Sequence, residues 1–162
     1  MEVFVLNTIF ESVAVIDTFE SLIWVDRYWE CGDFELYAHA TPELLSVMQP
    51  GYYLYLKTSE HVMVIENRQM SSDIDDGDYI TVTGRSLESL LDRRIVWGQT
   101  VLTGSFQAGI QQLLNENVIS PSDSNRRMSN FIFEASTDPL ITAQTIDAQF
   151  LRDNLYTAIT EL

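Results

Sequence analysis

The first half of the chain alternates short apolar segments with polar breaks. Residues 7, 17 and 31–33 are the breaks, and the segments between them are rich in β-branched and aromatic side chains. These segments are Val3–Leu6, Ser12–Ile16, Leu22–Trp29 and Phe34–Ala38. Strands this short and this closely spaced predict an antiparallel sheet. In Leu22–Trp29 both alternating sets are largely apolar, so this strand should be covered on both faces, while Asp26 and Arg27 need partners or a sheet edge.

A short helix and a second group of strands follow. Thr41-Pro42-Glu43 is a helix start, because Thr41 can cap, Pro42 needs no donor at the first helical position and Glu43 faces the positive helix end. Pro50-Gly51 ends this helix. The next apolar segments predict three strands that form a second meander. They are Tyr52–Lys57, His61–Met70 and Tyr79–Gly84.

The segment after Tyr79 predicts a strand that leads directly into a helix. Gly84 would allow a tight turn and Ser86 would cap the helix. Leu87, Leu90 and Leu91 would then form its apolar stripe.

Periodicity changes after Trp97, which places a subdomain boundary near residues 98–103. From a cap at Ser105, apolar residues recur on one helical face as far as Val118. Residues 117–130 are polar and predict a loop. Phe131–Phe133 and Thr142–Ile146 predict two further strands, and residues 153–162 predict a final helix.

Composition predicts a folded protein with a strongly acidic surface. The 162 residues suffice for one compact domain, or for one and part of another, and 46% of them are hydrophobic. Twenty-four acidic against nine basic residues give a net charge of −15. This balance argues against binding nucleic-acid phosphates or an anionic membrane. The single cysteine, Cys31, and the absence of a signal-peptide start indicate folding in a reducing cytoplasm. No apolar run approaches the roughly 20 residues that span a bilayer.

Candidate chemical sites are weak. Asp73–Asp78 invites a calcium interpretation, but the spacing of ligand and glycine positions does not fit, and a hairpin turn with positive φ at Asp76-Gly77 explains it better. Cys31 and His39 lack the signals of a nucleophile and its base. Two distant histidines give no metal-site spacing, and a phosphate loop would need a lysine that 98–105 lacks. We expect no metal, no cofactor and no catalytic residues, although carboxylate pairs assembled by the fold stay open. The unplaced carboxylates are Glu35, Glu66, Glu88 and Glu134.

Two groups of residues could form interfaces. Arg85, Arg93 and Arg94 bracket a predicted helix, where they form either an ion-pair network with nearby acids or contacts to carboxylates of a neighbouring subunit. The aromatic residues of the predicted strands could form a sugar-stacking platform, but strand aromatics more often belong to a core or an interface. This set comprises Trp24, Tyr28, Trp29, Tyr52, Tyr53 and Tyr55. We select Arg85, Arg93, Arg94, Trp97, Trp24 and Trp29 as candidate interface residues.

Two segments carry a resemblance to a known family. Phe19–Tyr37 resembles the opening of siphophage and prophage tail proteins of the ReqiPepy type. The run from Val82 to Trp97, with Gly-Arg-Ser-Leu followed by Asp-Arg-Arg, is similar to the most recognisable segment of that family. The helix that ends at Leu113–Ile119 also fits, so the resemblance covers nearly the whole chain.

The same order of elements resembles baseplate-hub proteins and the N-terminal regions of tail-associated lysins. The resemblance implies an α+β fold, mainly an antiparallel β-barrel or sandwich with short helices, followed by a small α+β subdomain. Residues 1–98 would be the tube-like hub portion, and residues 99–162 would begin an inserted subdomain that is cut short. It also implies a homotrimer of the full-length protein around the tail axis, in contact with distal tail, tube or tape-measure proteins. The protein would be located in the virion tail and made in the cytoplasm of the bacterial host.

Three functions therefore compete. The first is a non-enzymatic structural component of the tail tip or baseplate hub, whose acidic surface repels DNA rather than binding it. The second is a receptor- or carbohydrate-binding tail module that uses the aromatic strands. The third is the non-catalytic leading part of a tail-associated cell-wall hydrolase.

Overall fold

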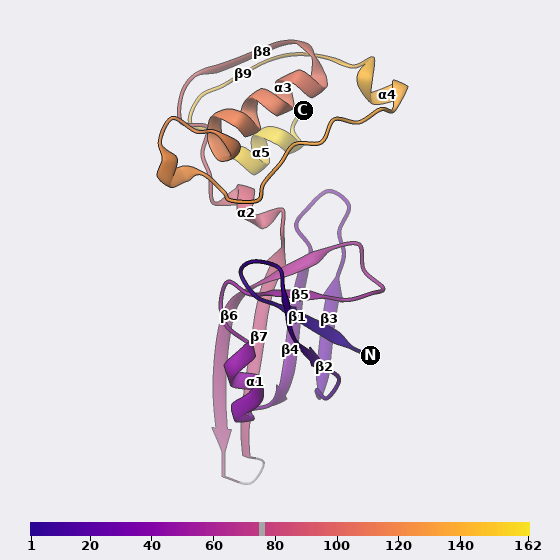
Figure 1. Cartoon of the computed structure of the whole chain (residues 1–162), viewed down its shortest axis with the longest axis vertical. Coiled ribbons are helices and arrows are strands. Elements are labelled where there is room, and N and C mark those ends of the chain that lie inside the picture. The colour runs from indigo at the N-terminus through magenta and orange to yellow at the C-terminus, as the bar shows by residue number, and fades with distance from the viewer. Residues whose placement is uncertain (75–76) are drawn as a thin grey trace. The chain divides into compact units, whose positions relative to one another are not determined.

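The protein consists of two compact units, each with its own antiparallel sheet and core (Figure 1). The computed structural model describes residues 1–74 and 77–162. The N-terminal unit is Met1–Ser89 and the C-terminal unit is Leu90–Leu162. The predicted α+β class, dominated by antiparallel pairing, is confirmed. Within the described ranges, no helix is long and apolar enough to cross a membrane.

The N-terminal unit is built on one seven-stranded sheet. Its order is β2-β1-β5-β6-β7-β4-β3, and every neighbouring pair is antiparallel. The strands are β1 (Val3–Leu6), β2 (Ser12–Ile16), β3 (Ser21–Val25), β4 (Asp33–His39), β5 (Tyr53–Tyr55), β6 (Val62–Asp73) and β7 (Gly77–Ser86). All seven predicted segments of this half contribute a strand.

Alternating burial shows why these segments form one sheet around one core. In β4 and β7, every second residue is buried, and the register places Leu36 opposite Val82 and Ala38 opposite Ile80. Side chains of successive residues point to opposite faces, so this pairing gathers one apolar face. The buried core comprises Val3, Val5, Ile16, Phe34, Leu36, Ala38, Leu44, Met48, Leu54, Leu56, Met63, Ile65, Ile80 and Val82.

The connection between the two outermost strands requires the sheet to curl. β2 and β3 lie at opposite ends of the strand order, yet only residues 17–20 separate them in sequence. Seven strands laid flat would hold the outer two about 29 Å apart, whereas the chain from Ile16 to Ser21 can span no more than about 18 Å. The sheet therefore wraps around its core. Among the residues that the structure describes, β2 and β3 do not pair, so no barrel is closed.

The first helix follows its predicted start. In α1 (Pro42–Val47), the Thr41 hydroxyl accepts from the Leu44 N–H at 3.2 Å, and proline occupies the first turn. The other end of α1 is tied to β6, because Nη1 of Arg68 donates to the carbonyls of Leu45 and Met48 at 3.0 and 3.3 Å. The helix thereby covers part of the core.

Gly84 does not form the predicted turn. It lies inside β7, opposite Phe34 on one side and Ile65 on the other. A Cβ at this position would lie 1.8 Å from the carbonyl oxygen of Val64. Glycine is needed here because two backbones approach closely next to a bulge in β6, where the register shifts at Glu66.

The predicted cap at Ser86 is also wrong. Ser86 is the last residue of β7, and its hydroxyl accepts from the Gly32 N–H at 2.9 Å. The helix starts later and is short, α2 (Ser89–Asp92). Long-range bonding to residue 32 therefore extends the strand beyond the point where local sequence favours a cap.

The prediction that Leu22–Trp29 is a strand covered on both faces is wrong. β3 ends at Val25 and lies at the sheet edge, with half of the Ile23 surface exposed. An edge strand can leave one face to solvent, and the aromatic residues beyond Val25 belong to the loop that leads to β4.

The C-terminal unit packs helices against a two-stranded sheet. α3 approaches this sheet closely, since a Cβ on Gly109 would lie 3.1 Å from a methyl carbon of Ile146. Its elements are β8 (Thr100–Ser105), α3 (Phe106–Leu114), a π-helical turn η1 (Asn115–Ile119), a 3₁₀ turn η2 (Ser124–Arg126), α4 (Pro139–Thr142), β9 (Thr145–Phe150) and α5 (Leu155–Thr160). Its core comprises Val96, Leu102, Leu113, Leu114, Val118, Ile146, Phe150, Leu155 and Ala158.

Predictions for this unit are less accurate. The helices after Ser105 and near the chain end are confirmed, although the Ser105 side chain makes no capping bond and Asn154 caps α5. Phe131–Phe133 is not a strand, and the strand expected at Thr142–Ile146 lies at β9 instead. β8, which pairs with β9, was not predicted.

Candidate interaction surfaces

The loop between β3 and β4 is braced at its first residues by a buried serine. Ser59 is almost fully buried, and its hydroxyl lies 2.9 and 3.1 Å from the two carboxylate oxygens of Asp26. The indole N–H of Trp24 donates to the same carboxylate at 3.1 Å. These bonds satisfy Asp26 and fix the point where the chain leaves β3.

The other end of the loop is held by Arg27 and by β7. The Arg27 guanidinium donates to the carbonyl of Cys31 at 3.0 Å and forms an ion pair with Asp33. Gly32 exchanges two bonds of 2.9 Å with Ser86, one through its N–H and one through its carbonyl. A Cβ on Gly32 would lie 2.5 Å from the Val25 carbonyl oxygen, so this chain crossing is tight. The loop is therefore anchored at both ends.

This braced loop displays two aromatic rings. Tyr28 is 88% exposed and Trp29 is 76% exposed. Their ring centroids lie 4.7 Å apart at an interplanar angle of 90°, the edge-to-face geometry that aromatic pairs favour. Because bonds at both ends hold the loop, less backbone freedom remains to be lost when these rings bind a partner. We name residues 26–32 the aromatic loop.

The predicted interface residues do not form one cluster. Trp24 is half-buried and packs on Phe34, with ring centroids 5.9 Å apart. Arg85 makes a two-pronged ion pair with Glu66 at 2.9 and 3.0 Å, which its position on β7 beside the β6 bulge allows. Trp29 belongs to the aromatic loop. The remaining three, Arg93, Arg94 and Trp97, belong to the C-terminal unit.

In the C-terminal unit, Trp97 forms a second exposed aromatic site. It is 69% exposed, and the guanidinium carbon of Arg126 lies 5.6 Å from its ring centroid. Arg126 also donates to the Ile95 carbonyl at 2.6 Å. The backbone N–H of Trp97 donates to the buried amide of Asn117 at 3.2 Å. This cation–π contact stabilises the position of the Trp97 ring and leaves most of its surface exposed to a protein partner.

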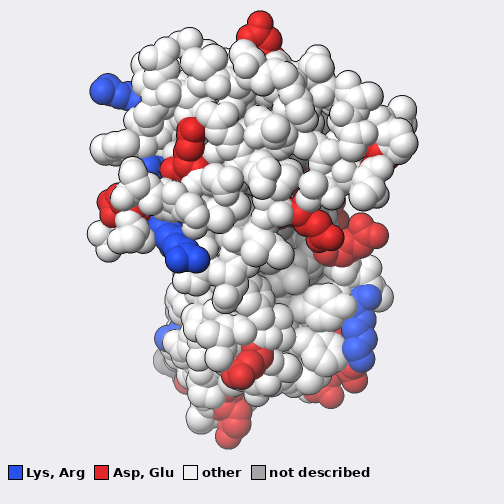
Figure 2. Space-filling view, turned by 45° about the horizontal axis from the view of Figure 1, so that its top comes forward, with Lys and Arg blue, Asp and Glu red and all other residues white. Residues whose placement is uncertain are grey.

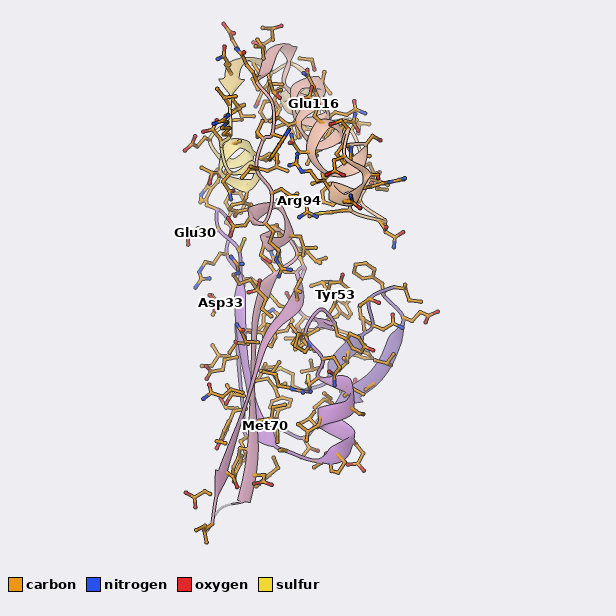
Figure 3. The ribbon with its side chains drawn as sticks, turned by 90° about the vertical axis from the view of Figure 1, so that its left-hand side faces the viewer. Glu30, Asp33, Tyr53, Met70, Arg94 and Glu116 are labelled. Atoms are coloured by element: carbon orange, nitrogen blue, oxygen red, sulfur yellow. The ribbon has the colours of Figure 1, made fainter. Side chains whose placement is uncertain are left out.

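The six aromatic residues that could have formed one sugar platform are divided. Tyr53 stacks on Phe10 with centroids 4.4 Å apart, and Tyr55 lies 6.2 Å from Phe4. Tyr52 packs against the core. Figure 3 labels Tyr53 on the far side of the N-terminal unit from Asp33, which closes the aromatic loop. A continuous platform of these residues is therefore not present.

Polar residues near Ser59 do not form a catalytic triad. Ser59 donates to Asp26 and accepts from the backbone N–H of His61 at 3.0 Å, while the His61 ring lies 3.1 Å from Glu88. Burial alone would raise the pKa of Glu88, but hydrogen bonds from Ser86, from its own backbone N–H and from His61 hold that pKa below its ordinary value. The geometry gives a charge-stabilising network rather than an activated nucleophile.

The other candidate chemistry is similarly dispersed. Cys31 precedes β4 and His39 ends it, and the seven extended residues of this strand alone span roughly 20 Å, so the two side chains lie far apart. In the predicted hairpin loop, Asp73 ends β6, Asp78 belongs to β7 and Gly77 has a φ of +90°. Asp75 and Asp76 lie outside the described residues, so the conformation expected at Asp76 stays a prediction.

Comparison with known protein families identifies the family of this chain. The family described as Siphovirus ReqiPepy6 Gp37-like protein matches residues 2–162. The chain therefore belongs to the Siphovirus ReqiPepy6 Gp37-like family, as the resemblance predicted. Comparison with curated protein sequences gave no significant match.

A solved structure supports the fold. The crystal structure of prophage tail protein gp18 from Listeria monocytogenes EGD-e is similar with a TM-score of 0.66 at 14% identity. The similarity covers 99% of this chain and 44% of that protein. This chain therefore corresponds to less than half the length of its structural relative.

Proposed function

We propose that this chain is a structural component of a tail tip or baseplate hub and acts by assembly around the tail axis. The observation that carries the proposal is the aromatic loop, whose two ends are held by hydrogen bonds and which carries two largely exposed rings. Tryptophan and tyrosine are enriched among the residues that contribute most to binding at protein interfaces. Family membership supplies the context, because tail proteins function in contact with one another.

Further features of the proposal rest on analogy with hub proteins. In it, residues 1–98 form the tube-like portion and residues 99–162 begin an inserted subdomain. The full-length protein would be a homotrimer whose neighbours are distal tail, tube or tape-measure proteins. Arg85, Arg93, Arg94, Trp97, Trp24 and Trp29 are the proposed contact residues. Of these, Trp29 and Trp97 have the most exposed rings.

An acidic surface on this chain is compatible with a ring of subunits through which DNA passes. The net charge is −15, and Figure 2 shows acidic side chains spread over the visible face of each unit rather than gathered into one patch. Charges of this sign repel phosphates over about one Debye length, roughly 8 Å at physiological ionic strength. An acidic lining would keep DNA from adhering, and we expect the purified chain not to retain duplex DNA at physiological salt.

The proposal is tested by replacing Trp29 in the phage. Trp29→Ser should lower the yield of complete tails about tenfold or more, because loss of a central interface tryptophan weakens binding by about 2 kcal/mol. Infectious titre and electron microscopy of lysates measure the yield, and circular dichroism of the purified chain checks that it folds. The control is Ile132→Ser, since Ile132 is similarly exposed, at 79%.

Three outcomes separate the candidate functions. If the variant chain folds but most particles lack complete tails, the assembly role is supported. Normal tails with normal infectivity would contradict it. Complete tails that fail to adsorb to host cells would instead favour the receptor- or carbohydrate-binding module, because the same two rings could stack on a sugar.

A further inference from the structure

A pocket of about 370 Å³ lies between the β2–β3 connection and α1. Its apolar lining includes core residues Ile16 and Leu44 and the half-buried Phe19 and Val47. All the residues that line it belong to the N-terminal unit. A cavity of this size accommodates one or two apolar side chains. Neither the interface residues nor the aromatic loop contributes to it.

The pocket runs along an unpaired strand edge. Three consecutive residues of β2, Ala14, Val15 and Ile16, line it. Because successive side chains point to opposite faces, a pocket lined by all three lies along the edge of the strand and not on one face. β1 occupies the other edge of β2, and no described strand pairs with the edge that borders the pocket. An unpaired edge beside an apolar pocket is the arrangement that accepts an added strand.

Carboxylates surround the pocket. Asp17, Glu20 and Glu43 line it with exposed side chains, and the only basic group among its lining residues is His39, 3.7 Å from Glu20. A bound segment with lysine or arginine next to its apolar side chain would pair with these carboxylates. An acidic segment would be repelled.

We propose that this pocket binds an extended, basic segment of a partner protein, which adds to the β2 edge and inserts an apolar side chain between β2 and α1. Charge complementarity decides the occupant. A second copy of this chain carries a net charge of −15 and a single lysine, so it is a poor match for an acidic rim. The proposal goes beyond the hub assignment, because it concerns what the N-terminal unit binds and not where the chain sits in the tail.

The test uses the whole chain and a capped, fluorescein-labelled peptide, Lys-Lys-Val-Leu-Val-Lys-Lys, in anisotropy titrations at low salt. Exchanging the central leucine for glycine should weaken binding by about tenfold or more, because the buried apolar side chain is lost. Exchanging the four lysines for glutamates should abolish binding. The proposal would be overturned if all three peptides bound with equal affinity. It would also be overturned if the lysine peptide did not bind the chain at millimolar concentration.

Strand addition has its own test. In an added antiparallel strand, alternate N–H groups face the neighbouring strand. N-methylation of one alternate set in the peptide should therefore abolish binding, whereas N-methylation of the other set should leave it nearly unchanged. If both sets behave alike, the segment does not add to β2.

The chain variant is the triple change Asp17→Asn, Glu20→Gln and Glu43→Gln, which should weaken binding of the lysine peptide about tenfold. A matched control with the same change in net charge replaces three exposed carboxylates outside the pocket, Glu30→Gln, Glu60→Gln and Glu161→Gln. Equal weakening of peptide binding by both triple variants would contradict a local role of the carboxylates around the pocket.

Sedimentation equilibrium completes the test. Self-association that the peptide reverses would assign the pocket to a second copy of the chain and refute the proposal of a partner protein. These titrations use the isolated chain, so their failure would leave the virion assembly test untouched.

Discussion

The two units stabilise their cores by different means. The N-terminal unit relies on backbone contact between strands that are distant in sequence, and at Gly84 this contact leaves no space for a side chain. The C-terminal unit places a buried polar side chain at its centre. Asn117 is 1% exposed, donates to the Leu113 carbonyl at 2.9 Å and accepts from the N–H of Trp97. One core is therefore sensitive to added volume, and the other to the loss of a hydrogen-bonding group.

The largest expected effect is that of Gly84→Ala. Its methyl group would meet the Val64 carbonyl at 1.8 Å and the Phe34 ring at 2.8 Å, so the strands must separate. We expect a loss of about 3 kcal/mol or more in the free energy of unfolding of the N-terminal unit, measured by urea titration with Trp24 fluorescence in a background in which Trp29 and Trp97 are replaced by phenylalanine. Gly98→Ala is the control, because nothing lies within 4 Å of a Cβ there. Equal stability of the two variants would refute the close approach.

The second effect concerns the C-terminal unit. Asn117→Ala leaves the Trp97 N–H without its acceptor and opens a small cavity, so it should lower the free energy of unfolding by about 2 kcal/mol. The loss should appear as early hydrogen exchange of β8, β9 and α3, with protection of β6 and β7 retained. Asn125→Ala, at an exposed position, should change little. Uniform loss of protection in both units would contradict the idea that each core is stabilised separately.

The smallest effect is a pH dependence at Glu88. Because its pKa in the folded state lies below the ordinary value of 4.5, the charged carboxylate stabilises the fold above that pH, and this stabilisation is lost as pH falls through the folded pKa. Since Glu88 is partly exposed, wild type should exceed Glu88→Gln by less than about 1 kcal/mol at pH 6. The difference should shrink below pH 4.5. Thermal unfolding between pH 3 and 6 measures it, with Glu35→Gln as control, and a constant difference would contradict the assignment.

Local patterns predicted the elements of the N-terminal unit because each strand shows alternation and α1 has its own cap. The failures there are residues whose role depends on distant partners. Gly84 resembles a turn glycine until β6 lies beside it, and Ser86 resembles a cap until Gly32 donates to it. In the C-terminal unit, only Thr100 and Leu102 of β8 are buried, and its partners in β9 lie forty or more residues away in sequence. A single sequence does not show such pairings.

The interaction surfaces were predicted unevenly for the same reason. The sequence predicted Trp29 as an interface residue, because aromatic residues are enriched at interfaces. The support of its loop was not visible, because Ser59 and Asp26 are 33 residues apart. The pocket at β2 was also missed, since its lining comes from β2, its connection to β3, the end of β4 and α1. Whether Arg93, Arg94 and Trp97 contact a neighbour stays a prediction.

The strand order also determines when this sheet can form during synthesis. The β1–β2 and β3–β4 hairpins are local, and among the described strands the sheet connects them through β5, β6 and β7. Until β7, which ends at Ser86, has left the ribosome, the strands β2-β1-β5-β6 and the β3–β4 hairpin remain two separate pieces with open edges, a form prone to mispair with other chains. Slow translation before Ser86 would prolong the time during which these strand edges stay unpaired. Fast synthesis of β6, the long strand that carries Met70 in Figure 3, and of β7 would shorten that time.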